Sequence, residues 1–100
     1  MKVIVEGHKY EIDNYEGHGT QIISFVHKQP VDNVELGLVE DGVTNEQVLE
    51  VLIHRLQYLN QKMPCRENAL AITNLEQSLM WLEKRKKDRK KRGVEGKYLG

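Results

Sequence analysis

The 100-residue sequence predicts an α+β fold, in which a small N-terminal antiparallel β-sheet precedes a long antiparallel two-helix hairpin. Two observations predict this order. The first forty residues contain short β-branched and aromatic runs, and the apolar period changes to helical spacing at Thr44. Pro64 then divides the helical part in two, because proline has no amide donor. We expect one domain, with the sheet in residues 1–42, the hairpin in 43–93 and a C-terminal tail in 94–100.

Four segments have the composition that strands prefer. They are Val3–Val5, Tyr10–Ile12, Thr20–His27 and Val34–Val39. Glycine-containing breaks at 6–9 and 17–19 separate the first three, and Pro30 ends the third. Asp41 and Gly42 follow the fourth. Together they predict one small antiparallel sheet.

The first helix begins with a capping box, in which Thr44 is the N-cap and Gln47 reaches back to it. Apolar residues then follow at helical spacing. They are Val48, Leu49, Leu52, Ile53, Leu56, Leu59 and Met63. Pro64 stops this helix, since it also disfavours helical geometry in the residue before it.

The second helix is expected to start near Cys65–Glu67 and to be longer than the first. Its apolar stripe alternates by three and four residues, as in a helix that packs on one face. The stripe consists of Ile72, Leu75, Leu79 and Leu82. The next two stripe positions hold Lys86 and Arg89, so the apolar seam ends while helix-forming residues continue. Gly93 is a natural C-terminal cap.

Charge is divided unevenly along the chain. Residues 1–83 hold 6 basic and 13 acidic side chains, whereas residues 84–100 hold 9 basic and 2 acidic ones. The two parts therefore carry −7 and +7, although the whole chain is formally neutral. A basic end of this kind attracts phosphates, carboxylates or the acidic part of a second subunit.

No apolar run approaches the roughly 20 residues of a membrane span, and the lone cysteine indicates a reducing cytosol.

The arginines of the basic run share one helix face. Arg85, Arg89 and Arg92 lie at i, i+4 and i+7, and Trp81, Ser78 and Asn74 continue the face backwards. Guanidinium groups bind phosphate oxygens through paired hydrogen bonds, and an indole can stack on a base. The face therefore suits a phosphorylated nucleotide. Its alternative role is a solvated helix end, and Trp81 alone also suits a core or subunit interface.

The first helix carries a second polar face, made by His54, Arg55, Tyr58 and Lys62. Tyr58 suits stacking on a base or a half-buried amphipathic position. Arg55 suits a phosphate or an acidic residue. Asn68, near the start of the second helix, suits a helix cap or an amide contact to a ligand.

We expect no catalytic residue, metal site or cofactor. The histidines His8, His18, His27 and His54 lack metal-ligand spacing, and Cys65 has no partner cysteine. Gly17–Gly19 lacks the lysine of a phosphate-binding loop, and no serine lies in a nucleophile elbow. The sequence therefore favours binding over chemistry.

The hairpin from Gly42 to Lys97 resembles the phage Thoeris anti-defence sponges, which share it with anti-CBASS sponges. The resemblance lies in four blocks and is most specific in the last. The four blocks are Thr44–Leu49 with Leu52–Leu56, Pro64–Asn68, Ala71–Glu76, and Leu79–Arg85 with Asp88, Arg89 and Arg92–Gly96. The N-terminal strands are similar to the sheet that distinguishes the anti-Thoeris members.

The resemblance implies a protein that sequesters a cyclic ADP-ribose isomer without turnover in the cytoplasm of an infected bacterium. Some members also bind the cyclic di- or trinucleotides of CBASS in separate pockets. The family forms dimers, or hexamers of three dimers, with pockets between subunits. By position, Tyr58 and Asn68 match its base-contacting region, and Arg85 and Arg89 match its phosphate-contacting helix. Arg92 is added from helix geometry alone.

Two other interpretations remain open at this point. In one, the chain is a small nucleic-acid-binding protein whose basic C-terminal helix contacts a phosphate backbone. The acidic remainder of the chain disfavours this, because a backbone binder gains from positive charge over its whole surface. In the other, the chain is a structural oligomer whose basic helix docks on acidic neighbours.

Overall fold

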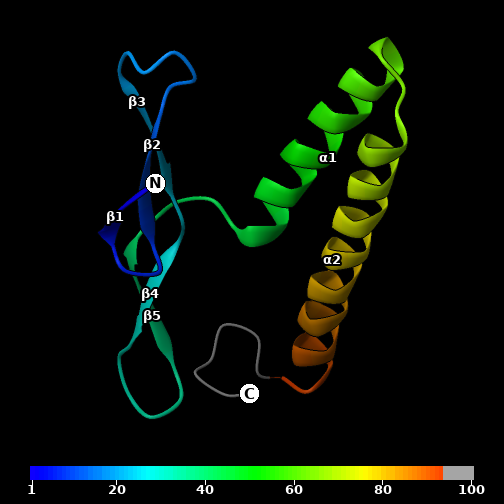
Figure 1. Cartoon of the computed structure of the whole chain (residues 1–100). Coiled ribbons are helices and arrows are strands. Elements are labelled where there is room, and N and C mark those ends of the chain that lie inside the picture. The colour runs from blue at the N-terminus through cyan, green and yellow to red at the C-terminus, as the bar shows by residue number, and fades with distance from the viewer. Residues whose placement is uncertain (94–100) are drawn as a thin grey trace. The chain divides into compact units, whose positions relative to one another are not determined.

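The computed structural model describes residues 1–93, and the expected tail at 94–100 lies outside the described residues. Strands precede helices, so the α+β fold class is confirmed (Figure 1). The chain divides into two compact units, of which the first is Met1–Thr44 and the second begins at Asn45. The change of period at Thr44 thus coincides with the boundary between the units. The expectation of a single domain stays a prediction.

The first unit contains two antiparallel sheets where the sequence predicts one. Strands β1 (Lys2–Val5), β2 (Lys9–Asp13) and β3 (Thr20–Ser24) form one sheet in the order β1-β2-β3. Strands β4 (His27–Pro30) and β5 (Leu36–Glu40) form the other. The predicted strand at 20–27 is therefore divided between β3 and β4.

The division has a visible cause at Phe25 and Val26, which pair with a third segment. Phe25 forms an isolated parallel bridge with Val43. The Val26 amide donates to the Val43 carbonyl at 2.9 Å, and the Val43 amide donates to the Ser24 carbonyl at 2.9 Å. These bonds take the chain out of the first sheet before β4 begins. Sequence composition does not reveal them, because Phe25 and Val26 are ordinary strand formers.

Gly42 allows this close approach of backbones. A Cβ at Gly42 would lie 2.7 Å from the Phe25 carbonyl carbon and closer still to the Ser24 carbonyl oxygen. Both are backbone atoms that no side-chain rotation can move aside. Gly42 is therefore needed for packing at this crossing rather than for a turn.

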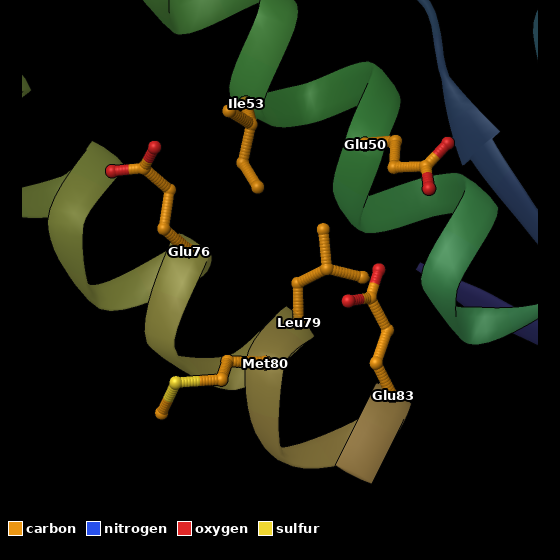
Figure 2. Close-up of a pocket in the computed structure, with 6 residues that line it drawn as sticks. All are labelled: Glu50, Ile53, Glu76, Leu79, Met80 and Glu83. Atoms are coloured by element: carbon orange, nitrogen blue, oxygen red, sulfur yellow. The ribbon is translucent and has the colours of Figure 1, made fainter. Parts of the chain in front are cut away.

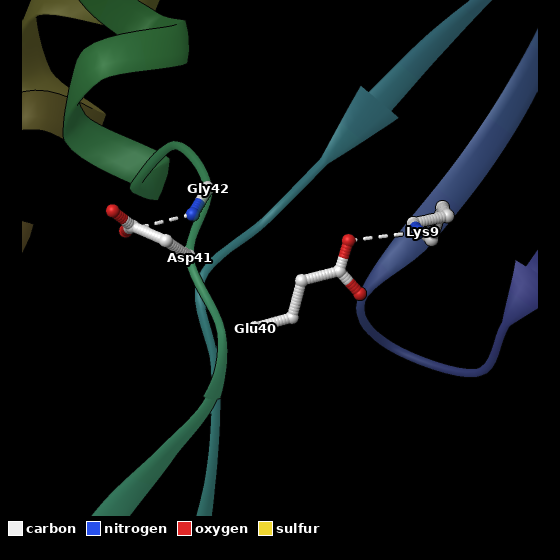
Figure 3. A network of polar contacts seen from close by, with 4 residues as sticks. All are labelled: Lys9, Glu40, Asp41 and Gly42. Atoms are coloured by element: carbon white, nitrogen blue, oxygen red, sulfur yellow. Dashed lines mark hydrogen bonds and ion pairs between the residues drawn. The ribbon is translucent and has the colours of Figure 1, made fainter.

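Two polar contacts hold the neighbouring segment (Figure 3). The Lys9 ammonium pairs with the Glu40 carboxylate at 2.8 Å, which joins β2 to the end of β5. The Asp41 carboxylate accepts a hydrogen bond from the Gly42 amide at 2.9 Å. Nearby, the rings of His8 and His27 are stacked with centroids 3.6 Å apart. The Lys9–Glu40 ion pair and the stacked histidines connect the two sheets of the first unit.

The loop between β4 and β5 is organised by Asp32. Its carboxylate accepts hydrogen bonds from the amides of Glu35 and Val34, each at 2.7 Å. These bonds stabilise the ionised form and lower the pKa of Asp32 below its ordinary value of 3.8. The loop is therefore an Asx-type turn supported by a charged acceptor.

The second unit is the predicted helical hairpin. Helix α1 spans Asn45–Lys62 and α2 spans Arg66–Lys91, so the turn falls at residues 63–65 as expected. Cys65 is the N-cap of α2, and its Sγ accepts from the Asn68 amide at 3.4 Å. Gly93 follows α2 with φ +73°, which confirms the predicted cap. In the described residues, neither helix is long and apolar enough to cross a membrane.

The hairpin has little core of its own. Ile53 is 8% exposed and is the single buried side chain among residues 1–93. The predicted α2 stripe of Ile72, Leu75, Leu79 and Leu82 is half-buried throughout. Leu52 and Leu59 on α1 and Met63 just after it are exposed, so the buried stripe there is narrower than the apolar pattern predicts. Two helices alone cannot cover both faces of α1.

Candidate ligand-binding site

An open depression of about 270 Å³ lies along the C-terminal part of α2. It is lined by Trp81, Lys84, Arg85, Asp88, Arg89 and Arg92. The structure thus brings together the indole and the three guanidinium groups that the sequence places on one helix face. Because they all come from one continuous helix, their spacing is set by helical geometry rather than by a loop.

The side chains of the depression differ in how far they are exposed, and their exposure excludes a core role for Trp81. Trp81 is 62% exposed, so its interpretation as a core residue of the hairpin is wrong. Its indole is free to serve either a subunit interface or a stacked base. Arg89 is half-buried, whereas Arg85 and Arg92 are exposed. The depression therefore presents cations that remain accessible to a ligand.

The polar helix face that the sequence predicts does not line the depression on the N-terminal side of Trp81. The Ser78 hydroxyl donates to the Asn74 carbonyl at 3.0 Å, within the same helix. Neither Ser78 nor Asn74 lines the depression. A serine that bonds back to the preceding turn is a common arrangement inside helices. Trp81 is thus the first residue along the chain that lines the site.

Two lining residues were missed by sequence reasoning. Lys84 and Asp88 flank the arginines, and the Lys84 ammonium lies 3.3 Å from the Asp88 carboxylate. Helical spacing alone identifies them, since Lys84 follows Trp81 by three positions and Asp88 follows Arg85 by three. Sequence reasoning considered the cations of the run as ligand-binding residues and did not consider its single carboxylate, Asp88.

Helix stability explains only part of the basic run. Cations in the last turn, here Arg89, Lys90 and Lys91, interact favourably with the negative end of the helix dipole. Within the run, however, like charges also stand one turn apart, as at Lys86 and Lys90. Such pairs destabilise a helix by about 0.2–0.5 kcal/mol each. Eight basic residues in nine positions therefore exceed what the helix end requires.

A second group of predicted site residues lies near the tip of the hairpin. Tyr58 is 55% exposed, and the Lys62 ammonium lies 5.4 Å from its ring centroid. Arg55 is also exposed on α1, one turn earlier. Asn68 is half-buried in the first turn of α2. Because Cys65 is the N-cap, the capping role considered for the Asn68 side chain is wrong.

The tip group and the basic depression are far apart in one chain. Asn68 and Arg85 are seventeen positions apart on α2, which corresponds to about 26 Å along a helix axis. One small nucleotide cannot contact both groups in the same hairpin. In one chain, therefore, Trp81, Arg85, Arg89 and Arg92 lie in one depression. Tyr58, Arg55 and Asn68 lie outside it.

A second depression, of about 300 Å³, lies between α1 and α2 (Figure 2). It is lined by Glu50, Ile53, Glu76, Leu79, Met80 and Glu83. Its three carboxylates surround an apolar floor and would repel a phosphate. Among residues 1–93, no group of three or more histidine, cysteine or acidic side chains is arranged to hold a metal ion.

These features define a class: a strand unit joined to an antiparallel helical hairpin whose longer helix ends in an arginine-lined depression. The family model described as the Acb2/Tad1 hairpin domain matches residues 20–86. The chain therefore belongs to the Acb2/Tad1 hairpin domain family. The match begins at β3 and includes α1 and the part of α2 up to Lys86.

A relative from Bacillus phage SBSphiJ7, described as Thoeris anti-defense 1, is 48% identical to this chain over 79 residues. The similar region covers 74% of this chain and 56% of the relative. The chain thus spans little more than half of that relative's length. The likeness supports the family resemblance that the hairpin sequence indicates.

Proposed function

We propose that this protein is a phage anti-defence sponge. It binds a cyclic ADP-ribose-type immune signal of the Thoeris system in the cytoplasm of the infected bacterium and sequesters it without turnover. The observation that carries the proposal is the row of Arg85, Arg89 and Arg92 beside Trp81 in one depression. A pyrophosphate matches the arginines, and an adenine matches an exposed aromatic ring. The relative's description supports the anti-defence role.

The proposed site contains residues from two chains. Tyr58 and Asn68 belong to the base-contacting group, and Arg85 and Arg89 bind phosphates, yet Asn68 and Arg85 are about 26 Å apart in one hairpin. An antiparallel pair of hairpins related by a twofold axis would place the tip of one against the α2 end of the other, and the axis would repeat this contact at a second site. The exposed apolar side chains of α1, such as Leu52 and Leu59, suit such an interface. Dimers, or hexamers of three dimers, are the proposed assemblies.

Calorimetric titration tests this function directly. Purified protein is titrated with cyclic ADP-ribose isomers and with cyclic di- and trinucleotides, then heated so that the released ligand is identified by mass spectrometry. Tight binding with recovery of unaltered ligand is expected. Recovery of a chemically changed ligand would show an enzyme, and absence of binding to every compound would refute the sponge.

Salt dependence separates this function from nucleic-acid binding. A protein that contacts six to ten backbone phosphates loses roughly 10³–10⁵ in affinity between 50 and 200 mM salt. A ligand with two phosphates should lose far less. The same titrations at both salt concentrations, with a DNA duplex in parallel, give the comparison. A steep loss, together with tighter binding to the duplex, would favour the basic helix as a backbone binder.

A further inference from the structure

The carboxylate at the centre of the basic depression is only partly explained by helix stability. Asp88 lies four residues before Arg92, the C-cap of α2, where the helix dipole is unfavourable to an anion. Aspartate also has a low helix propensity. Asp88 separates like charges of the basic run and precedes Arg92 in the favourable i, i+4 orientation. Its ion pair with Lys84 has the cation N-terminal to the anion, which is the weaker orientation. Both partners are more than half exposed, so the pair contributes little.

The same carboxylate is also a disadvantage for binding phosphate alone. Asp88 lines the depression with Lys84, Arg85, Arg89 and Arg92, and its charge reduces the field that these cations present to a polyanion. A site selected only for phosphates would place a neutral or basic residue there. The position therefore suits a ligand that offers hydrogen-bond donors beside its phosphates.

Ribose hydroxyl groups are donors of this kind. In dinucleotide-binding folds, an acidic side chain accepts hydrogen bonds from ribose hydroxyls while separate donors hold the pyrophosphate. An ionised carboxylate is an acceptor only, with two oxygens available for this purpose. In this protein Lys84 and Asp88 lie 3.3 Å apart, so an ammonium for phosphate and an acceptor for a hydroxyl stand side by side.

We propose that Asp88 is a specificity-determining residue that accepts a hydrogen bond from a ribose hydroxyl of the ligand. Arg85 and Arg89 hold the phosphates next to it, and the site prefers ribose-containing ligands over deoxyribose-containing ones. This proposal rests on the proposed function, because it assigns Asp88 to the same site.

The test measures how hydroxyl preference depends on Asp88. The probes are the cyclic ADP-ribose isomer that binds most tightly and the set of its analogues that each lack one ribose hydroxyl. For the unmodified chain, one analogue should bind about tenfold to a hundredfold more weakly than the parent compound. In Asp88→Asn this ratio should fall severalfold, because the neutral amide oxygen is a weaker acceptor than the carboxylate and the variant weakens binding of the parent but not of that analogue. Helix content and thermal stability should not decrease.

Glu83→Gln is the matched control, since Glu83 is another α2 carboxylate but lines the other depression. It should leave the ratio unchanged. An unchanged ratio in Asp88→Asn, which means equal affinity changes for parent and analogue, would overturn the hydroxyl contact. Lower stability with an unchanged ratio would assign Asp88 to the helix instead. If Arg85→Ala also left affinity unchanged, the proposed site would fail as well, whereas loss of binding in Arg85→Ala would confine the failure to Asp88.

Discussion

The two depressions on α2 differ little in size but have opposite chemistry. The one between the helices has a floor of Ile53 and Leu79 with glutamates at its edge, and the one at the helix end is lined by arginines. The change falls between Glu83 and Lys84, where the apolar seam stops. Up to that point α2 contacts α1, and beyond it the helix presents side chains that its own hairpin does not cover. The first part therefore supports the fold, and the second is available for a ligand.

The largest expected effect is on the stability of the inter-helix part. Ile53→Ala should lower the free energy of unfolding of the hairpin by about 2–5 kcal/mol, because it removes the single buried side chain of the described residues. Chemical denaturation followed by circular dichroism measures this. Val51→Ala, at a position 69% exposed on the same helix, is the control and should change stability by less than about 0.5 kcal/mol. Equal effects of the two variants would show that α1 and α2 do not pack as described.

The next effect is on ligand affinity at the helix end. Arg85→Ala and Arg89→Ala should each weaken binding of a cyclic ADP-ribose isomer about tenfold to a hundredfold, since a charge-assisted hydrogen bond contributes roughly 1.5–3 kcal/mol. Neither should unfold the hairpin. Titration calorimetry with parallel thermal melts separates the two quantities. Unchanged affinity in both variants would make the basic run a solvated helix end.

A smaller effect separates geometry from charge. Arg85→Lys keeps the positive charge but removes the planar guanidinium that binds two phosphate oxygens at once. Affinity should fall by severalfold, less than in Arg85→Ala. Lys87→Ala, a cation outside the depression, should have little effect and serves as the control. If Lys87→Ala weakened binding more than Arg85→Lys, net charge rather than the arginine row would determine affinity.

Sequence reasoning predicted the hairpin more accurately than the strand unit, for physical reasons. Pro64 and Gly93 affect the backbone at their own positions, so the ends of the helices can be predicted from the local sequence. The split between β3 and β4 depends instead on hydrogen bonds from Val43 to Ser24 and Val26. Such contacts join residues distant in sequence and leave no local pattern.

The candidate site shows the same division. Helical spacing was enough to place Arg85, Arg89 and Trp81 on one face, and it would also have placed Asp88 there. The expectation that tip and helix-end residues share a pocket follows from the family resemblance, since spacing along one chain separates Tyr58 and Asn68 from the arginines. What spacing cannot supply is the arrangement of a second copy.

The smallest expected effect tests whether the acidic depression takes part in binding at all. Glu76 lies thirteen positions from Arg89, about 20 Å along the helix, which exceeds the screening length of about 8 Å at physiological salt. Glu76→Gln should therefore change ligand affinity by less than twofold, as measured by the same titration. Glu50→Gln, on α1 in the same depression, should behave alike. A tenfold change in either variant would mean that the acidic depression of one copy lies close to the arginine row of another, and the separation of roles between the two depressions would be wrong.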